Sequence, residues 1–150
     1  LNLIKIYCMN YFTSTKSNPL IIDIVLLIIR IFVGFAMLSH GFPKLQQLLS
    51  GEEIQFYNFL GIGEKFTLIL AVFAEFVCSI FIILGLFTRF AVFFLIITMA
   101  VAGLVVHNAD PFSKRETSLL YLSVYSLIFA AGPGKYSIDG MISKRKESNW

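Results

Sequence analysis

Long apolar runs alternate along the chain with short polar connections. Four runs stand out, at residues 20–41, 66–87, 90–107 and 117–132. A helix needs about 20 apolar residues to cross the hydrocarbon core of a bilayer, and the first three runs have about that length. The fourth run is shorter, and the triplet Gly132, Pro133 and Gly134 ends it because these residues do not continue a helix.

These runs predict helices rather than strands. They are long for strands, and an open sheet edge cannot face lipid. They also lack the alternation of polar and apolar positions that membrane barrel strands show. The pattern therefore predicts an all-α membrane protein, a four-transmembrane-helix bundle over residues 20–140. An N-terminal tail at 1–19 and a basic C-terminal tail at 141–150 flank it.

The polar connections predict how the bundle sits in the membrane. The longest of them, residues 42–65, has spaced leucines and phenylalanines that predict an interfacial helical segment. The two tails and the turn after the second run hold seven lysines and arginines, against four in the connections on the other side. Positive residues stay on the cytoplasmic side, so we expect both termini in the cytoplasm.

Composition supports the membrane class. Of 150 residues, 57% are hydrophobic and 14% are charged, whereas soluble domains have about 25% charged residues. A soluble globular domain and a disordered chain are therefore excluded. The net charge of +3 is too small for a phosphate-binding footprint. We expect the lipid bilayer, and no nucleic acid, as a partner.

Familiar catalytic motifs are missing from the sequence. Cys8 and Cys78 lie far apart and no C-x-x-C occurs, so neither a disulfide framework nor dithiol chemistry is expected. The chain has no Walker loop, Rossmann fingerprint, G-x-S-x-G or H-E-x-x-H. No catalytic residue and no metal site are predicted from motifs.

Two charges inside the apolar runs are predicted to meet. At about 100° per residue, Arg30 shares one helical stripe with small and polar residues: Asp23, Gly34, Met37 and Gly41. Small residues beside polar ones suit a close helix–helix contact in lipid. Counted from the inner ends of their runs, Arg30 and Glu75 lie at depths of about 15 and 18 Å. A lone charge at mid-bilayer is costly, so we expect an intramembrane ion pair, which either handles protons or substrate or fixes helix register.

Further polar residues predict two clusters, one near each membrane face. His40 and His107 end two parallel runs, and we expect them to face one outer cavity. Three roles stay open for them: binding a quinone head group and relaying its protons, ligating a haem, which is disfavoured, or simple solvation at the interface. Tyr121 and Tyr125 share a face, either in the same cavity or in an interfacial aromatic belt. On the inner side we expect a cluster of Thr88, Arg89 and Asp139.

Four sequence segments, in this order, resemble the DoxX family of small membrane proteins. They are residues 30–44 (RIFVGFAMLSHGFPK), Glu75 with residues 84–89 (LGLFTR), His107, and residues 132–139 (GPGKYSID). The resemblance covers about residues 20–139. It implies a four-helix protein of the bacterial inner (cytoplasmic) membrane. The recurrent polar positions of the family map onto Arg30, His40, Gly41, Lys44, Glu75, Arg89, His107 and Asp139.

The resemblance also suggests a function. The family is similar to the membrane subunit of an archaeal thiosulfate:quinone oxidoreductase, and relatives are linked to oxidative-stress membrane complexes. We therefore expect a membrane subunit of a quinone-linked oxidoreductase, with quinone near His40 and His107 and with Arg30 and Glu75 deeper. No redox centre is evident in the chain, so a protein partner would carry the electron donor, and a second copy of the chain stays open as a partner. The alternative is a non-catalytic membrane scaffold or assembly factor for a redox or stress-response complex. A carrier of small solutes or protons is disfavoured, because the sequence pattern lacks paired broken helices.

Overall fold

The computed structural model describes residues 18–51 and 54–147. The predicted N-terminal tail, with Cys8, lies almost wholly outside these residues. The main helices are α2 (Pro19–Leu49), α3 (Glu64–Val72), α4 (Cys78–Leu84), α5 (Thr88–Val101), α6 (Phe112–Ala131) and α7 (Ile138–Glu147). Three short segments join them: the 3₁₀ turn η1 (Phe59–Gly61) and the π-helical segments η2 (Phe73–Val77) and η3 (Ala102–Val106).

Three helical stretches are long and apolar enough to cross a membrane. They are Pro19–Leu49, Glu64–Leu84 and Thr88–Val106, and they correspond to the first three predicted runs. The chain is therefore an all-α, multi-pass membrane protein. The fourth predicted run lies in α6, whose first turns carry Lys114, Arg115 and Glu116. A fourth crossing by α6 and the orientation of the termini stay predictions.

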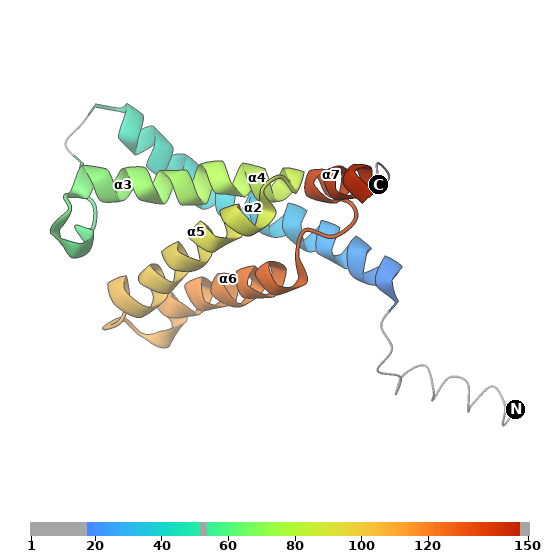
Figure 1. Ribbon diagram of the computed structural model, residues 1–150. Coiled ribbons are helices and arrows are strands. Elements are labelled where there is room, and N and C mark those ends of the chain that lie inside the picture. The colour runs from blue at the N-terminus through green and yellow to red at the C-terminus, as the bar shows by residue number, and fades with distance from the viewer. Residues whose placement is uncertain (1–17, 52–53, 148–150) are drawn as a thin grey trace, which may run out of the picture.

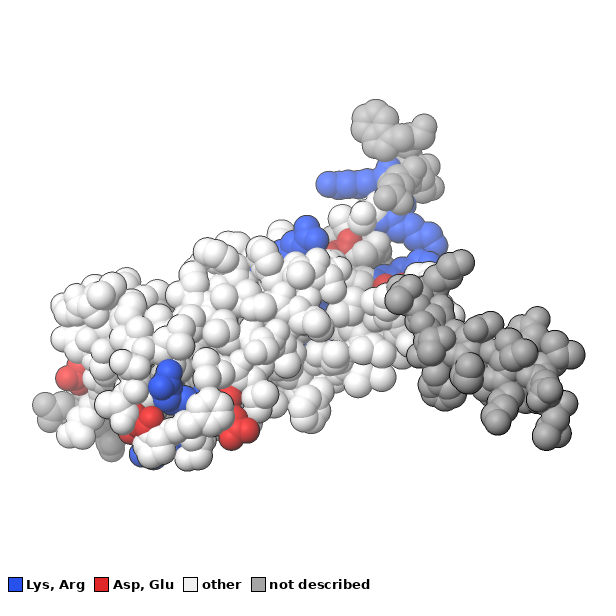
Figure 2. Space-filling view, turned by 90° about the horizontal axis from the view of Figure 1, so that it is seen from below, with Lys and Arg blue, Asp and Glu red and all other residues white. Residues whose placement is uncertain are grey.

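The helices form an elongated bundle with its polar groups at the ends. α2 runs antiparallel to the stretch α3–η2–α4, α5 returns beside α4, and α6 packs along α5 (Figure 1). α7 lies at the end of the bundle where α2 begins. On the face shown in Figure 2, charged side chains gather mostly toward the two ends, with a largely uncharged surface between them. This distribution matches a bundle that crosses a bilayer.

The predicted stripe of small residues on α2 makes the closest helix–helix contact. Gly34 and Gly41 are both buried. A Cβ placed on Gly34 would lie 3.2 Å from the carbonyl oxygen of Ser79, and one on Gly41 would lie 2.7 Å from the carbonyl carbon of Glu75. Only glycine allows the backbones to approach this closely in lipid. Two glycines of this stripe therefore pack against the second apolar run, as a close helix–helix contact requires.

Two connections differ from their predictions. α2 does not end at residue 41 but continues through Pro43 to Leu49, so the predicted interfacial segment begins as the end of α2. Half-buried Lys44 and Leu48, four residues apart, extend the packed face of the helix beyond the proline. The described remainder of the connection contains only η1. At the C-terminus, where a basic tail was predicted, Ile138–Glu147 forms α7.

Candidate functional site

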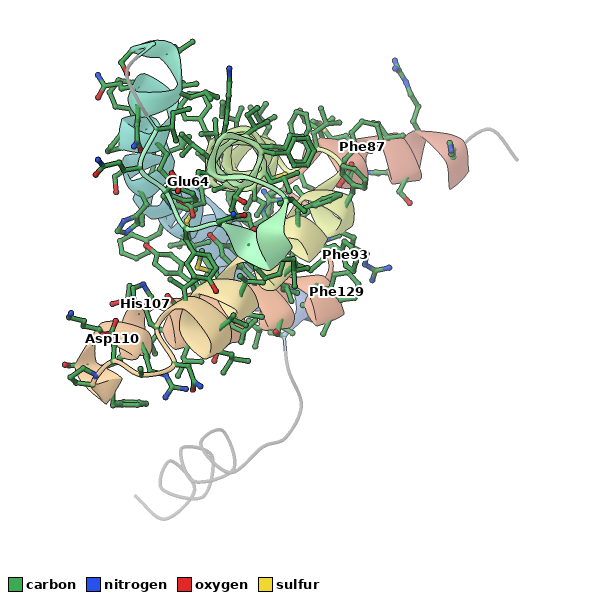
Figure 3. The ribbon with its side chains drawn as sticks, turned by 90° about the vertical axis from the view of Figure 1, so that its left-hand side faces the viewer. Glu64, Phe87, Phe93, His107, Asp110 and Phe129 are labelled. Carbon is green, nitrogen blue, oxygen red and sulfur yellow. The ribbon has the colours of Figure 1, made fainter. Side chains whose placement is uncertain are left out.

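A cavity of about 340 Å³ opens at the end of the bundle away from α7. Its walls come from α2, residues 56–59, the stretch α3–η2 and the stretch α5–η3. Most lining side chains are aliphatic or aromatic. The polar ones are Lys44, Tyr57, Thr67, Glu75, Thr98 and His107. Figure 3 looks onto this end, with His107 and Asp110 close together at the rim.

Glu75 is the buried acid of this cavity. It lies in η2, is 3% exposed, and receives a hydrogen bond and ion pair from Lys44 through its Oε1 atom. Its Oε2 atom has no hydrogen-bond partner among the described residues. The Ser79 hydroxyl donates to the Glu75 backbone oxygen at 2.7 Å. Single π-helical turns often mark functional sites, and here one carries Glu75 while a second, η3, immediately precedes His107.

The predicted ion pair between Arg30 and Glu75 is wrong, because the two residues lie at different levels of the bundle. Gly41, and not Arg30, lies opposite Glu75. Arg30 lies opposite Gly85, where a Cβ would collide with the guanidinium. The second helix ends at this level, whereas α2 starts 11 residues before Arg30. Eleven residues of helix rise about 16 Å, which is the size of the error in register.

Arg30 instead holds the segment that follows α6. Its two terminal nitrogens donate to the backbone oxygens of Pro133, at 2.6 Å, and Tyr136, at 2.7 Å. The side chain is 1% exposed. Nearby, Asp23 accepts a hydrogen bond from the backbone N–H of Lys135 at 2.9 Å. These contacts tie the glycine–proline–glycine break to α2.

The cluster that was predicted for the inner side forms around Asp139, but not all of the predicted residues belong to it. The Asp139 carboxylate accepts hydrogen bonds from the backbone N–H groups of Phe87, at 2.9 Å, and Thr88, at 2.8 Å. It therefore caps the first turn of α5 from a different helix, where a negative charge is favourable. The structure thus brings together Thr88 and Asp139, as expected. Arg89 is exposed, and Arg30 takes the place at the cluster that Arg89 was expected to fill.

His107 is oriented by an acid that the sequence reading missed. Its Nδ1 atom lies 2.7 Å from Oδ2 of Asp110, and the Lys114 amine lies 3.8 Å from Oδ1 of the same carboxylate. The hydrogen bond from His107 lowers the pKa of Asp110 below its ordinary value. With Nδ1 donating to this carboxylate, Nε2 is left as the free nitrogen of the ring. The spacing of three residues after His107 is the signal that could have identified Asp110.

The two histidines do not share the cavity. His107 lines it, but His40 is exposed and is not among its lining residues. The His40 ring instead meets the edge of Tyr121 at 6.0 Å between centroids, and Tyr121 stacks on Tyr125 at 5.9 Å. The expectation of one cavity between His40 and His107 is therefore wrong, because the side of α2 that carries His40 faces α6. Lys44, which was counted from the sequence as a loop charge and as one of the recurrent polar positions of the resembled family, is the residue that reaches the cavity from α2.

Comparison with known proteins identifies a family. The model of the DoxX family matches residues 25–108, which include the three membrane-crossing stretches and His107. No curated protein and no solved structure matches this chain.

Proposed function

The chain belongs to the DoxX family, and from this premise and the geometry of the cavity we propose that it is the membrane subunit of a quinone-linked oxidoreductase. The quinone head group would bind in the cavity between Lys44, Glu75 and His107. The proposal also places the protein in the bacterial inner membrane, with α6 as a fourth crossing and both termini in the cytoplasm.

One observation carries the proposal: the cavity combines an apolar, aromatic wall with a few polar groups that suit a planar ring bearing two oxygens. Phe56 and Phe59 offer ring surfaces, and Lys44, Thr98 and His107 offer hydrogen bonds. Binding sites for small molecules are mostly apolar, with a few convergent polar groups that fix orientation. The volume of about 340 Å³ falls in the range of such sites.

The chemistry divides between this chain and a partner. Reduction of a quinone to a quinol takes two electrons and two protons. The described residues contain no cluster of three or more metal-binding side chains, and we assign the electrons to a partner protein that carries a redox centre. The contribution of this chain would be to bind the head group and to exchange protons with it through His107 and Glu75.

The two histidines provide a matched test. The protein is purified in mild detergent, stripped of lipid, and titrated with a short-chain benzoquinone while binding is followed by calorimetry. We expect His107→Ala to weaken binding at least about tenfold, since it removes a hydrogen bond from a buried head group. His40→Ala removes an imidazole outside the cavity and should bind like the parent. Binding that is absent in the parent, or equal in both variants, refutes the proposal and leaves the scaffold as the function to test.

A further inference from the structure

Two buried oxygens in the middle of the helix bundle have no hydrogen-bond partner among the described residues. They are Oε2 of Glu75 and the hydroxyl of Tyr125. Glu75 is 3% exposed and Tyr125 is fully buried. Tyr125 lies in one core cluster with Cys78, which is one turn after Glu75, and with Met37, which is one turn before the Gly41 that contacts the Glu75 backbone. Because buried polar groups are nearly always satisfied, two neighbouring unsatisfied oxygens call for a common partner.

The surroundings of Tyr125 make its hydroxyl conspicuous. Its neighbours in the core are apolar or weakly polar, including Met37, Cys78, Leu95 and Met99. A phenylalanine would fill the same space without leaving a hydroxyl unpaired. The hydroxyl therefore serves no packing purpose at this position.

Each of the two oxygens belongs to a residue that reaches, directly or through a neighbour, one of two hollows in the bundle. Glu75 lines the cavity described above. Tyr125 stacks on Tyr121, and Tyr121 lines an apolar groove of about 570 Å³ between α2 and α6. Glu75 thus borders the cavity, and the stacked pair of Tyr125 and Tyr121 extends from the core toward the groove between α2 and α6.

We propose that Glu75 and Tyr125 form a proton-carrying site, in which one water molecule bridges Glu75 Oε2 and the Tyr125 hydroxyl. A bridging water is the physical solution for two buried polar atoms that do not reach each other directly. The ionised carboxylate accepts a hydrogen bond from this water, which in turn accepts one from the Tyr125 hydroxyl. The site thereby satisfies both orphaned atoms at once.

Proton transfer at this site is balanced without any redox step. A proton passes from a hydronium ion in the cavity to Glu75 Oε2 and leaves a neutral water molecule behind. The new O–H of the Glu75 carboxylic acid then donates to the bridging water. The reverse transfer restores the carboxylate. Among the described residues, the charged and titratable groups that pair with Glu75, line its cavity or act on it electrostatically are Lys44 on α2, Tyr57 in the connection before α3, His107 after η3 and Tyr125 on α6. Lys44 remains on Oε1 throughout, so only Oε2 changes its protonation.

The biological role of this site rests on the proposed function, since a bound quinone would exchange protons with Glu75. The test of the site itself needs no quinone. Infrared difference spectra of the lipid-stripped protein are recorded across the pH range in which circular dichroism shows it folded. We expect a protonated-carboxyl stretch in the parent that Glu75→Gln abolishes and that Glu75→Asp shifts. Glu75→Asp keeps the assignment possible if Glu75→Gln does not fold.

Tyr125→Phe then tests the second half of the site. It removes only the hydroxyl, and we expect the Glu75 band to move to higher frequency because the carboxyl loses part of its hydrogen bonding. Tyr136→Phe, which changes an exposed phenol at the other end of the bundle, should leave the band in place. Parent spectra without a Glu75 band at any pH, or a band that Tyr125→Phe leaves unchanged, would overturn the inference. Quinone binding measured on the same variants shows separately whether the proposed function stands.

Discussion

The close backbone contact between α2 and η2 at Gly41 predicts a destabilising effect for the addition of one methyl group. A Cβ on Gly41 would lie 2.7 Å from the carbonyl carbon of Glu75, 2.8 Å from its oxygen and 2.9 Å from the backbone nitrogen of Phe76. All three atoms belong to the backbone of η2, so no side chain can rotate away. Because such atoms rest at about 3.5–4.0 Å, Gly41→Ala must push α2 and η2 apart by roughly 0.8 Å.

The size of the effect follows from two opposing terms. Overpacking of this kind costs about 1–3 kcal/mol, and an unyielding backbone favours the upper half of that range. Alanine recovers about 0.5–1 kcal/mol relative to glycine inside a helix. We therefore expect Gly41→Ala to lower the free energy of unfolding by about 1–2 kcal/mol. For a chain of this size, the loss corresponds to a fall in Tm of about 2–8 °C.

A buried thiol supplies the assay. Cys78 is fully buried in the bundle core, so a dye that becomes fluorescent on reacting with thiols reports unfolding when Cys8 is first replaced by serine. Gly103→Ala is the matched control, because its Cβ would lie 3.2 Å from the Ser118 Cβ and otherwise meet only the adjustable side chain of Leu119. We expect this control to melt near the parent. If Gly41→Ala melts as high as Gly103→Ala, the assigned contact between α2 and η2 is incorrect.

Three further predictions concern polar contacts. Arg30→Gln removes the charged donor to two backbone oxygens and should lower the free energy of unfolding by about 3 kcal/mol. We expect a lower Tm and faster proteolysis of residues 132–147, whereas unchanged proteolysis would contradict the assigned contacts. Asp139→Ala leaves the first turn of α5 uncapped and should lower the free energy of unfolding by about 1 kcal/mol. Asp139→Asn should lower Tm less than Asp139→Ala in the same melting assay, and equal losses of Tm in the two variants would argue against capping. The lowered pKa of Asp110 means that its hydrogen bond with His107 stabilises the fold above about pH 4, the ordinary pKa of the carboxyl, and is lost as the pH falls through the lowered value. Parent and Asp110→Asn should therefore differ in Tm at neutral pH and converge in acid, and a difference that does not change with pH would count against this ion pair.

Periodicity was enough to locate the main packed face of α2. The three crossing stretches follow from run length, because hydrocarbon accepts only uninterrupted apolar helices. The stripe that holds Gly34 and Gly41 follows from the angle between successive residues, and the structure places both glycines against the second helix. These features depend on local geometry, which the order of residues determines directly.

The register between helices does not follow from the same information. A run of apolar residues gives the length of a helix, but many offsets along a partner bury similar surface. Arg30 and Glu75 were therefore matched by their distance from the ends of the runs. This matching assumed that the second helix begins or ends level with the first turns of α2, whereas residues 132–139 fill the space beside those turns. Lys44 lies only about 40° from Arg30 on the helical wheel and was available as a partner. The proline at residue 43 concealed it, because proline usually ends a helix.

The two roles that were weighed as alternatives for one ion pair are divided between the two polar ends of the bundle. At the end that holds α7, Arg30 binds backbone oxygens and Asp139 binds backbone N–H groups, and such partners are fixed by the fold. At the other end, Glu75 keeps one oxygen unpaired beside a cavity and His107 keeps one ring nitrogen free. Two buried atoms at the end that holds α7, Nε of Arg30 and Oγ1 of Thr88, also lack a hydrogen-bond partner among the described residues. Neither residue lines the cavity, so a ligand bound there meets the unpaired oxygen of Glu75 but not these two atoms. The cavity, together with the fixed backbone partners of Arg30 and Asp139, is therefore the reason why we propose the chemistry at the end that holds Glu75 and His107.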